Sequence, residues 1–422
     1  MVAIVGESEG GKPESQQGDK TKTIHGLKPA YSTQEWQDIV VAHFAAPKVD
    51  YQSLIANLTK IMNLSLRNTA LFSGFLISLL MSSAQAETTL PSTSPNIQYT
   101  GRTAIDGDST RLAFPGSMVE IAFSGPSLTL NGSVDGSASH LNASIDGVDL
   151  PRVDLESGQF NYTFKHYLDP AQPHALRLVR RNESWNGVLK IDSITLADEG
   201  ELLAPPTRPS RSILCIGDSI TCGEKSDLIP PETIGLHTWN AERSYGWMLA
   251  KDFDAQIHLV SCGGRGLIRD WQGLSEAPTA PVFFERALPD DSTSVWDHQS
   301  YQPDLITICL GTNDFSQGIP EKEAFVSAYI KFVARIHELH PEARVLLISG
   351  PWFGEGDPKK EALNAYINET VDHFNELGQS FARAHFFTAT YPGSELDAHP
   401  NALQHRAMAT DIGQTIVDWL KW

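Results

Sequence analysis

Hydrophobic and polar residues follow different patterns in the two halves of the chain. From about residue 97 to residue 200, short stretches alternate apolar and polar positions, and Gly, Asp, Asn and Pro separate them at regular intervals. Alternation with a period of two is typical of strands with one buried face, and closely spaced turns favour a β-sandwich. The predicted strands are MVEIAFSG, SLTLNGSV, HLNASIDG, QFNYTFKHYL, HALRLVRR and VLKIDSITL. We therefore predict a β-sandwich (jelly-roll) domain over residues 97–200.

The second half, residues 212–422, alternates apolar strands with amphipathic helices. The predicted strands are SILCIGD, AQIHLVSC, LITICLG, RVLLISG and AHFFTA, and the long helices are EKEAFVSAYIKFVARIHEL, KKEALNAYINETVDHFNELGQ and NALQHRAMATDIGQTIVDWLKW. Fully apolar strands alternating with helices indicate an α/β domain with a five-stranded, doubly wound parallel sheet. The proline-rich residues 201–211 are expected to link the two domains. In such sheets, ligands bind beyond the carboxyl ends of the strands.

Residues 62–86 have the layout of a secretory signal peptide. A short polar lead containing Arg67 precedes an apolar run, and Ala84-Gln85-Ala86 resembles a cleavage site. Because a signal peptide must stand at the N-terminus, we expect translation to start at Met62 and the mature protein to begin near Glu87.

Residues 1–61 would then be a mis-assigned upstream extension, and residues 87–96, rich in Ser, Thr and Pro, a flexible leader. The alternative is that Met1 is the true start and that residues 70–86 form a signal anchor or a core helix. The first interpretation predicts a secreted or periplasmic protein that is not membrane-bound in its mature form.

The charge of the chain narrows the choice of partner. The formal net charge of −19 over 422 residues argues against nucleic acid, an anionic membrane or a strongly acidic substrate. A neutral ligand is the easier expectation, although the same charge also keeps a protein soluble. We expect a monomer.

The four cysteines form no CxxC pair, which argues against a zinc ribbon or a thioredoxin-like motif. Cys215 and Cys309 lie inside predicted strands and are expected to be buried small hydrophobes. Cys222 and Cys262 follow strand ends, and whether they form a disulfide is left open.

The residues that follow the strands carry the candidate chemistry. Gly217-Asp218-Ser219 places a serine on a tight strand-to-helix turn, where its hydroxyl is exposed and its own N–H can face an oxyanion. The loop Ser261-Cys262-Gly263-Gly264-Arg265-Gly266 lets backbone approach a ligand closely, and Gly311-Thr312-Asn313-Asp314 offers a side-chain amide.

A histidine and a carboxylate follow the fifth strand, in Leu396-Asp397-Ala398-His399-Pro400. Histidine acting as a general base needs a group that holds its tautomer, and Asp397 on the same loop can reach His399. His405 is the nearest competitor, but it lies inside the predicted final helix. Ser219, Asn313 and His399, each after a strand, together predict nucleophilic acyl chemistry.

These blocks, GDSIT, SCGGRG, GTND and DAHP, resemble the four blocks of the SGNH (GDSL) hydrolase superfamily. The short Asp-x-His spacing, the phrase LGTNDFS and the β-rich first half make the chain most similar to carbohydrate esterase family 2. In the first half, YTGR, FPGSMVEIAFSG and ASIDGV are similar to that family's N-terminal module. The resemblance implies a jelly-roll domain joined to a flavodoxin-like SGNH domain.

The resemblance also implies roles for single residues. Ser219 would be the nucleophile and His399 the general base, with Asp397 orienting it. The Ser219 amide, the Gly264 amide and the Asn313 side chain would form the oxyanion hole. Many superfamily members have Asp-x-x-His instead, and parts of the family lack the acid, so Asp397 is either essential or only helpful here.

The activity implied is removal of acetyl groups from hemicelluloses such as xylan or glucomannan, by two-step acyl transfer without a metal or organic cofactor. The expected partner is an acetylated polysaccharide or oligosaccharide. Trp352 and Arg265 are the candidates for substrate binding, although core packing or loop anchoring is the ordinary role of a tryptophan in this position. Two alternatives remain: a lipid or acyl-thioester hydrolase on the same fold, and a degenerate carbohydrate-binding protein.

Overall fold

The computed structural model describes residues 87–422, with the exception of 166–167, 198–199 and 230. The predicted signal segment (62–86) and upstream extension (1–61) therefore lie outside the described residues.

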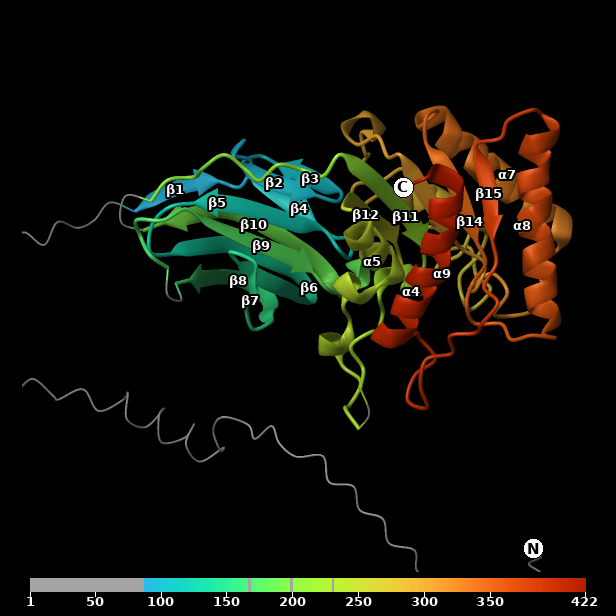
Figure 1. Ribbon diagram of the computed structural model, residues 1–422. Helices are drawn as coiled ribbons and strands as arrows, with labels where there is room; N and C mark the ends of the chain where they lie inside the picture. Colours follow the sequence, from blue (N-terminus) through green and yellow to red (C-terminus); the bar gives the residue numbers. More distant parts are fainter. Residues whose placement is uncertain (1–86, 166–167, 198–199, 230) are drawn as a thin grey trace, which may run out of the picture. The chain divides into compact units, whose positions relative to one another are not determined.

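The first half forms an antiparallel sheet that folds around a core of its own (Figure 1). Along its main path the strand order is β2-β5-β9-β6-β10-β4-β3, while β1 pairs with β10, and β7 and β8 pair with β6. The strands are β1 (Thr88–Pro91), β2 (Ile97–Thr100), β3 (Thr103–Asp106), β4 (Ser109–Leu112), β5 (Met118–Phe123), β6 (Leu128–Ile145), β7 (Val148–Asp149), β8 (Val153–Phe164), β9 (His174–Arg180) and β10 (Gly187–Leu196). This confirms the expectation of a β-rich first domain.

Strand β6 joins two segments that the sequence predicts as separate strands, SLTLNGSV and HLNASIDG. Its 18 residues run through Gly136, and the pairing with β8 shifts register between Val134 and Ala138. A bulge of this kind bends a strand without ending it. The part before the bulge pairs with β10, and the part after it pairs with β9.

Both segments expected to be irregular pair with the sheet. Thr88–Pro91 of the expected leader forms β1 and pairs with Ser193–Leu196 of β10. Ser92 is fully buried and hydrogen-bonds to Thr110 and to the Asp108 carbonyl. In the expected linker, Leu203 donates its N–H to the Ala122 carbonyl. The interpretation of residues 87–96 as a flexible leader was wrong, because backbone pairing is not visible in Ser/Thr/Pro composition.

The second half has the predicted five-stranded parallel sheet, in the order β12-β11-β13-β14-β15, which is a flavodoxin-like arrangement. Its strands are β11 (Arg211–Gly217), β12 (Ala255–Ser261), β13 (Leu305–Cys309), β14 (Arg344–Ile348) and β15 (Ala382–His385). The helices are α4 (Ser219–Cys222), α5 (Tyr245–Asp252), α6 (Ala280–Phe283), α7 (Lys322–Leu339), α8 (Pro358–Glu376) and α9 (Ala402–Leu420). Short 3₁₀ turns are η1 (Ser184–Asn186), η2 (Leu236–Thr238), η3 (Ala241–Arg243) and η4 (His298–Ser300).

Both faces of the parallel sheet are covered by helices (Figure 1). Alternate residues of β11 enter different cores: Ile213 and Cys215 pack with α5 and α9, while Leu214 and Ile216 pack with α7 and α8. Burial on both sides explains the uninterrupted apolar strands. Strand β15 begins two residues earlier than predicted and ends at His385, where pairing with β14 stops.

All four cysteines are buried and free. The Cys222 thiol donates a hydrogen bond of 3.2 Å to the Ser261 hydroxyl, so the structure has no Cys222–Cys262 disulfide. Cys215 and Cys309 lie in strands, fully buried, as predicted.

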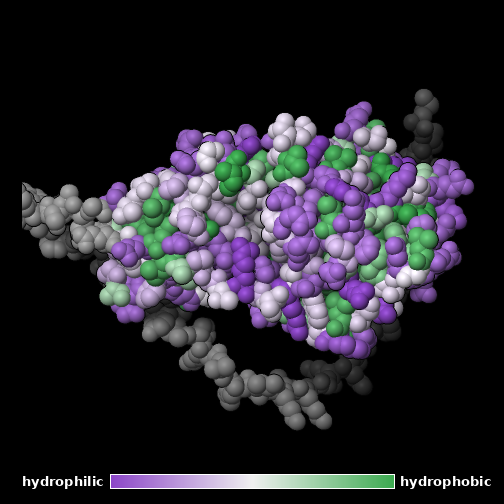
Figure 2. Space-filling model, turned by 90° about the horizontal axis from the view of Figure 1, so that it is seen from above, coloured by the Kyte–Doolittle hydropathy of each residue, from purple (hydrophilic) through white to green (hydrophobic). Residues whose placement is uncertain are grey.

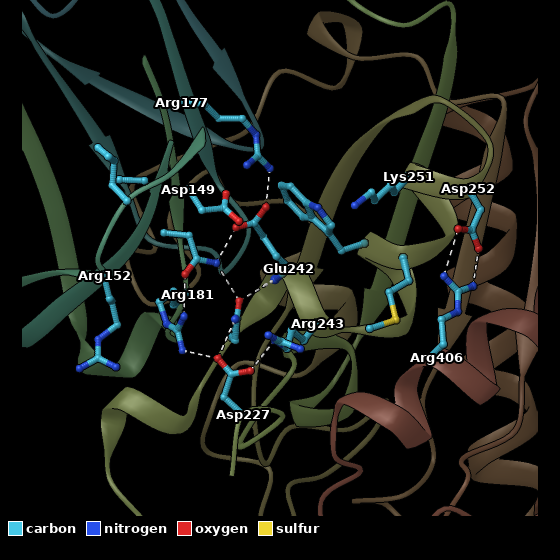
Figure 3. A pocket seen from close by; sticks show the side chains of 16 residues that line it. Asp149, Arg152, Arg177, Arg181, Asp227, Glu242, Arg243, Lys251, Asp252 and Arg406 are labelled. Carbon is cyan, nitrogen blue, oxygen red and sulfur yellow. Dashed lines mark hydrogen bonds and ion pairs between the residues drawn. The ribbon is translucent and has the colours of Figure 1, made fainter. Parts of the chain in front are cut away.

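A charged cleft lies between the β-rich domain and the segments η3, α5 and α9 of the second domain (Figure 3). Its volume is about 850 Å³. Ion pairs cross it: Arg181 of the first domain contacts Asp227 at 2.6 Å, and Arg177 contacts Glu242 at 2.5 Å. Asn142 adds a 2.9 Å hydrogen bond to Asn240. Residues of the β-rich domain are thus tied to the loops between β11 and α5.

On the face seen in Figure 2, hydrophobic residues form small groups separated by hydrophilic ones. None of the helices in the described part of the chain combines the length and hydropathy needed to span a bilayer.

Candidate active site

Ser219 is the first residue of α4, directly beyond the end of β11. Asp218 caps this short helix, since its Oδ1 accepts the Ile220 N–H at 3.0 Å. The turn is tight enough that a Cβ at Gly217 would lie 2.0 Å from the Thr221 hydroxyl, which requires glycine there. The packing holds Ser219 at the carboxyl edge of the sheet with 7% of its surface exposed.

The structure brings Ser219, His399 and Asp397 into one line of hydrogen bonds. His399 Nε2 lies 2.9 Å from Ser219 Oγ, and His399 Nδ1 lies 2.6 Å from Asp397 Oδ1. The same Asp397 oxygen accepts the His399 backbone N–H at 3.0 Å. A serine, an imidazole and a carboxylate in this order can generate a nucleophilic hydroxyl.

Two charged residues that the sequence reasoning missed complete this cluster. Lys225 Nζ donates to Asp397 Oδ2 at 2.7 Å and lies 3.1 Å from Glu224 Oε1. Glu224 Oε2 lies 3.6 Å from His399 Nε2. Burial acts to raise the pKa of Asp397, but hydrogen bonds from His399 and Lys225 outweigh it and hold that pKa well below its usual value. Their position directly after GDSITCG is the signal that could have identified them.

The glycine-rich loop after β12 lies beside Ser219. Gly264 has a φ of +74°, and a Cβ there would lie 2.8 Å from the Trp271 ring, so only glycine fits. Among the described residues, the Ser219 and Gly264 N–H groups have no hydrogen-bond acceptor. Buried Asp314 holds the next part of the loop by accepting the N–H groups of Leu267, Ile268 and Arg269.

Asn313 lies at the edge of the same space, 7% exposed. Its Nδ2 donates to the Arg265 carbonyl at 3.0 Å and lies 3.4 Å from Asp218 Oδ2. Burial raises the pKa of Asp218 to about 7. The amide is therefore oriented by the loop and the serine turn together.

These groups line a pocket of about 580 Å³. Three tryptophans contribute to its wall: Trp271, Trp352 and Trp185. Trp185 comes from the turn η1 of the β-rich domain and is 55% exposed. Sequence reasoning missed it, because nothing in the first half indicates which of its turns meets the second.

The two candidate substrate-binding residues are placed differently. Trp352 lines the pocket, with its ring centroid 5.9 Å from that of His399, and donates its indole N–H to the Ala398 carbonyl. Arg265 pairs with Asp290, and its side chain is outside the pocket wall. Its backbone carbonyl, by contrast, accepts the Asn313 amide.

His405, the competing histidine, is fully buried in α9, where its Nδ1 accepts the Tyr245 N–H at 3.2 Å. Burial lowers the pKa of His405 to about 3. In the described part of the chain, no three His, Cys, Asp or Glu side chains are grouped to hold a metal ion.

Comparisons with known proteins cover both halves of the chain. Residues 215–407 match the GDSL-like lipase/acylhydrolase family, and residues 99–206 match the carbohydrate esterase 2 N-terminal family. An acetylxylan esterase / glucomannan deacetylase of Cellvibrio japonicus is 36% identical over 345 residues, which cover 81% of this chain and 93% of that protein.

Solved structures of two family two carbohydrate esterases are similar to this chain in fold. A family two carbohydrate esterase from Cellvibrio japonicus superposes with a TM-score of 0.73 at 34% identity, covering 79% of this chain and 99% of that one. A second family two carbohydrate esterase, from Clostridium thermocellum in complex with cellohexaose, superposes with a TM-score of 0.71 at 27% identity. The match covers 77% of this chain and 99% of that one.

The fold and the matched domains define a GDSL-type ester hydrolase with an N-terminal β-rich domain. More narrowly, the chain belongs to carbohydrate esterase family 2. The superfamily predicted from the four sequence blocks is thereby confirmed, as are the family predicted from the Asp-x-His spacing and the β-rich first half and the assignment of the protein as an enzyme that hydrolyses carboxylic esters.

Proposed function

We propose that this carbohydrate esterase is a secreted serine esterase that removes O-acetyl groups from a hemicellulose such as xylan or glucomannan. The observation that carries the proposal is the line from Ser219 Oγ to His399 Nε2, 2.9 Å, and from His399 Nδ1 to Asp397 Oδ1, 2.6 Å. The name of the 36% identical relative supports the substrate class.

The reaction proceeds in two halves. His399 accepts the Ser219 proton while Oγ attacks the acetyl carbonyl carbon, and the resulting oxyanion lies among the Ser219 N–H, the Gly264 N–H and the Asn313 amide. The tetrahedral intermediate collapses, His399 returns the proton to the sugar oxygen, and the sugar hydroxyl leaves. Water, deprotonated by His399, then attacks the acetyl-serine carbonyl, and His399 returns that proton to Ser219 Oγ as the acyl–oxygen bond breaks and acetate leaves.

The pocket favours an acetylated sugar over the lipid alternative. Tryptophan rings stack on the apolar faces of sugar rings, and Trp185, Trp271 and Trp352 all line the wall. The wall also includes the charged side chains of Glu224 and Lys225, which are poor contacts for a long acyl chain. Comparing acetyl with octanoyl 4-nitrophenyl esters separates the two functions, because a lipid hydrolase prefers the longer chain.

Acetate release from acetylated xylan and acetylated glucomannan tests the proposal. The full chain should release acetate, and Ser219→Ala should lower the rate by at least about 10³-fold without loss of fold. Ser292→Ala, a change of an exposed serine, is the matched control. Retention of substantial activity in Ser219→Ala would exclude the serine mechanism, and a wild-type protein that binds the polymers without releasing acetate would support the degenerate binding protein.

A further inference from the structure

The turn between β9 and β10 is built around a buried arginine. Arg180, 1% exposed, donates to the carbonyl oxygens of Asn182, Glu183 and Gly187 and to the Ser139 hydroxyl. Four acceptors around one guanidinium hold the backbone of this turn in a single conformation.

The neighbouring arginine fastens the same turn to the catalytic domain. Arg181 donates to the carbonyl oxygens of Trp239 and His237, both at 2.9 Å, and to Asp227 at 2.6 Å. The Ala241 N–H donates in return to the Arg181 carbonyl at 3.2 Å. These hydrogen bonds attach the turn directly to the catalytic domain.

Glu183, at the centre of this turn, reaches the glycine-rich loop beside Ser219. It is fully buried, and its Oε2 accepts the backbone N–H of Gly263 and, at 3.2 Å, the indole N–H of Trp185. The fit is close, because a Cβ on Gly263 would lie 2.6 Å from both carboxyl oxygens. Gly263 directly precedes Gly264. In the proposed function, the Gly264 N–H donates to the oxyanion in the pocket.

Asp314 holds the other end of the loop through the N–H groups of Leu267, Ile268 and Arg269. The loop thus lies between two carboxyl groups, one from each domain. We infer that Glu183 is a positioning residue for ester hydrolysis: it aligns the peptide that presents the Gly264 N–H to the oxyanion. This inference rests on the proposed role of Gly264.

The protonation of Glu183 suits that role. Burial, and then the nearby charge of Glu224, raises the pKa of Glu183 well above its usual value. This shift favours the neutral carboxyl, which accepts the Gly263 N–H without placing a negative charge beside the developing oxyanion. An amide side chain has the same shape and keeps a carbonyl acceptor, whereas leucine keeps most of the volume but has none.

The test compares Glu183→Gln with Glu183→Leu in the full chain, using 4-nitrophenyl acetate as substrate. Because small displacements of an oxyanion donor are costly, Glu183→Leu should lower kcat by about 10-fold or more with KM nearly unchanged. Its affinity for methylboronic acid, a tetrahedral analogue that places an oxygen in the same hole, should fall in parallel. Glu183→Gln and the exposed control Glu156→Gln should stay near wild type. Wild-type kcat in folded Glu183→Leu, or equal losses in the Gln and Leu variants, would overturn the inference.

Gly263→Ala tests the same contact without removing the carboxyl group, and so decides the matter if Glu183→Leu does not fold. Its methyl group displaces the Glu183 carboxyl, and kcat and boronate affinity should again fall together. An unchanged kcat in Gly263→Ala would contradict the inference. Ser219→Ala in the same assay distinguishes the two proposals. If Ser219→Ala is inactive while Glu183→Leu and Gly263→Ala keep the wild-type kcat, the serine mechanism is supported and the role of Glu183 is contradicted.

Discussion

Lys225 donates a 2.7 Å hydrogen bond to Asp397 Oδ2, while Asp397 Oδ1 accepts the His399 ring N–H at 2.6 Å. The two oxygens of one carboxylate are thus shared between a lysine and a histidine. Lys225 itself adopts a φ of +54°, which non-glycine residues seldom do, and its ammonium lies 5.3 Å from the Trp239 ring centroid.

We first expect that a change at Asp397 lowers turnover less than a change at His399. His399→Ala removes the proposed base, whereas Asp397→Asn keeps an oxygen that accepts the imidazole N–H but loses the charge and the oxygen that accepts from Lys225. We expect His399→Ala to lose about 10²-fold more turnover than Asp397→Asn. Steady-state kinetics on 4-nitrophenyl acetate measure the ratio. Equal losses would indicate a triad that acts as one unit, and no loss in Asp397→Asn a Ser–His dyad.

Removing the lysine tests the other half of the shared carboxylate. Lys225→Met keeps the aliphatic stem but leaves Asp397 Oδ2 without its donor, so turnover should fall about 3- to 10-fold. The matched control is Lys251→Met, which changes an exposed lysine outside the pocket. A Lys225→Met enzyme with unchanged kcat would show that His399 and the backbone hold Asp397 unaided.

The same substitution should change stability in acid. The pKa of Asp397 is held low in the folded protein, so its contribution to stability is complete above its unfolded pKa of about 3.9 and is lost as pH falls through the lower folded pKa. Without Lys225 the folded pKa rises towards the unfolded one. The Asp397 contribution at pH 4–7 should therefore be smaller in Lys225→Met, measurable as a flatter fall of unfolding free energy below about pH 4.

Buried His405 makes the fold sensitive to weak acid. Its folded pKa of about 3 lies below the unfolded value of about 6.5, so the unfolded chain binds the extra proton between these values. Stability should fall as pH drops below about 6.5, by up to about 1.4 kcal/mol per pH unit from this group. Urea unfolding of His405→Gln at pH 4–7 should show a shallower slope than wild type. His237→Gln, at a more exposed histidine, is the control, and an identical slope in His405→Gln would contradict the expectation.

The four thiols should be unreactive in the folded enzyme. All are buried, and burial raises the pKa of Cys215 and Cys262 to about 12, so little thiolate is present at pH 8. Ellman's reagent should label none of the four within minutes in buffer and all four in guanidinium chloride. Fewer than four reactive thiols in denaturant without reductant would reveal a disulfide.

The segment before β2 should be needed for stability. A chain that begins at Glu87 keeps β1 and buried Ser92, whereas one that begins at Ile97 loses both. The shorter chain removes the Ser92 partner of the Thr110 hydroxyl and leaves Ser193–Leu196 of β10 paired on one side only, so it should be less stable by about 2 kcal/mol. Urea midpoints of the two proteins measure the difference. Equal midpoints would restore the interpretation of residues 87–96 as a flexible leader.

The sequence predicts the parallel sheet well because its strands are buried on both faces, which leaves a plain apolar signature. Ser219, Asn313 and His399 could be found because each follows such a strand, and the carboxyl ends of parallel strands meet. Glu183 and Trp185 could not, because their place depends on how one domain packs against the other. The joining of two predicted strands into β6 was also invisible, since Gly136 signals a turn and a bulge equally well.

The turn from Arg180 to Gly187 makes the pocket depend on both domains of the chain. It contributes to one wall of the pocket and supports the loop beside Ser219, although it is encoded more than thirty residues before that serine, in a different domain. A gene fragment that carries the hydrolase sheet alone would leave the Gly263 N–H without its acceptor and open the pocket on that side. Exchange of one half for that of another protein would therefore change this contact, whereas a substitution at Trp185 would change the pocket wall without altering the parallel sheet.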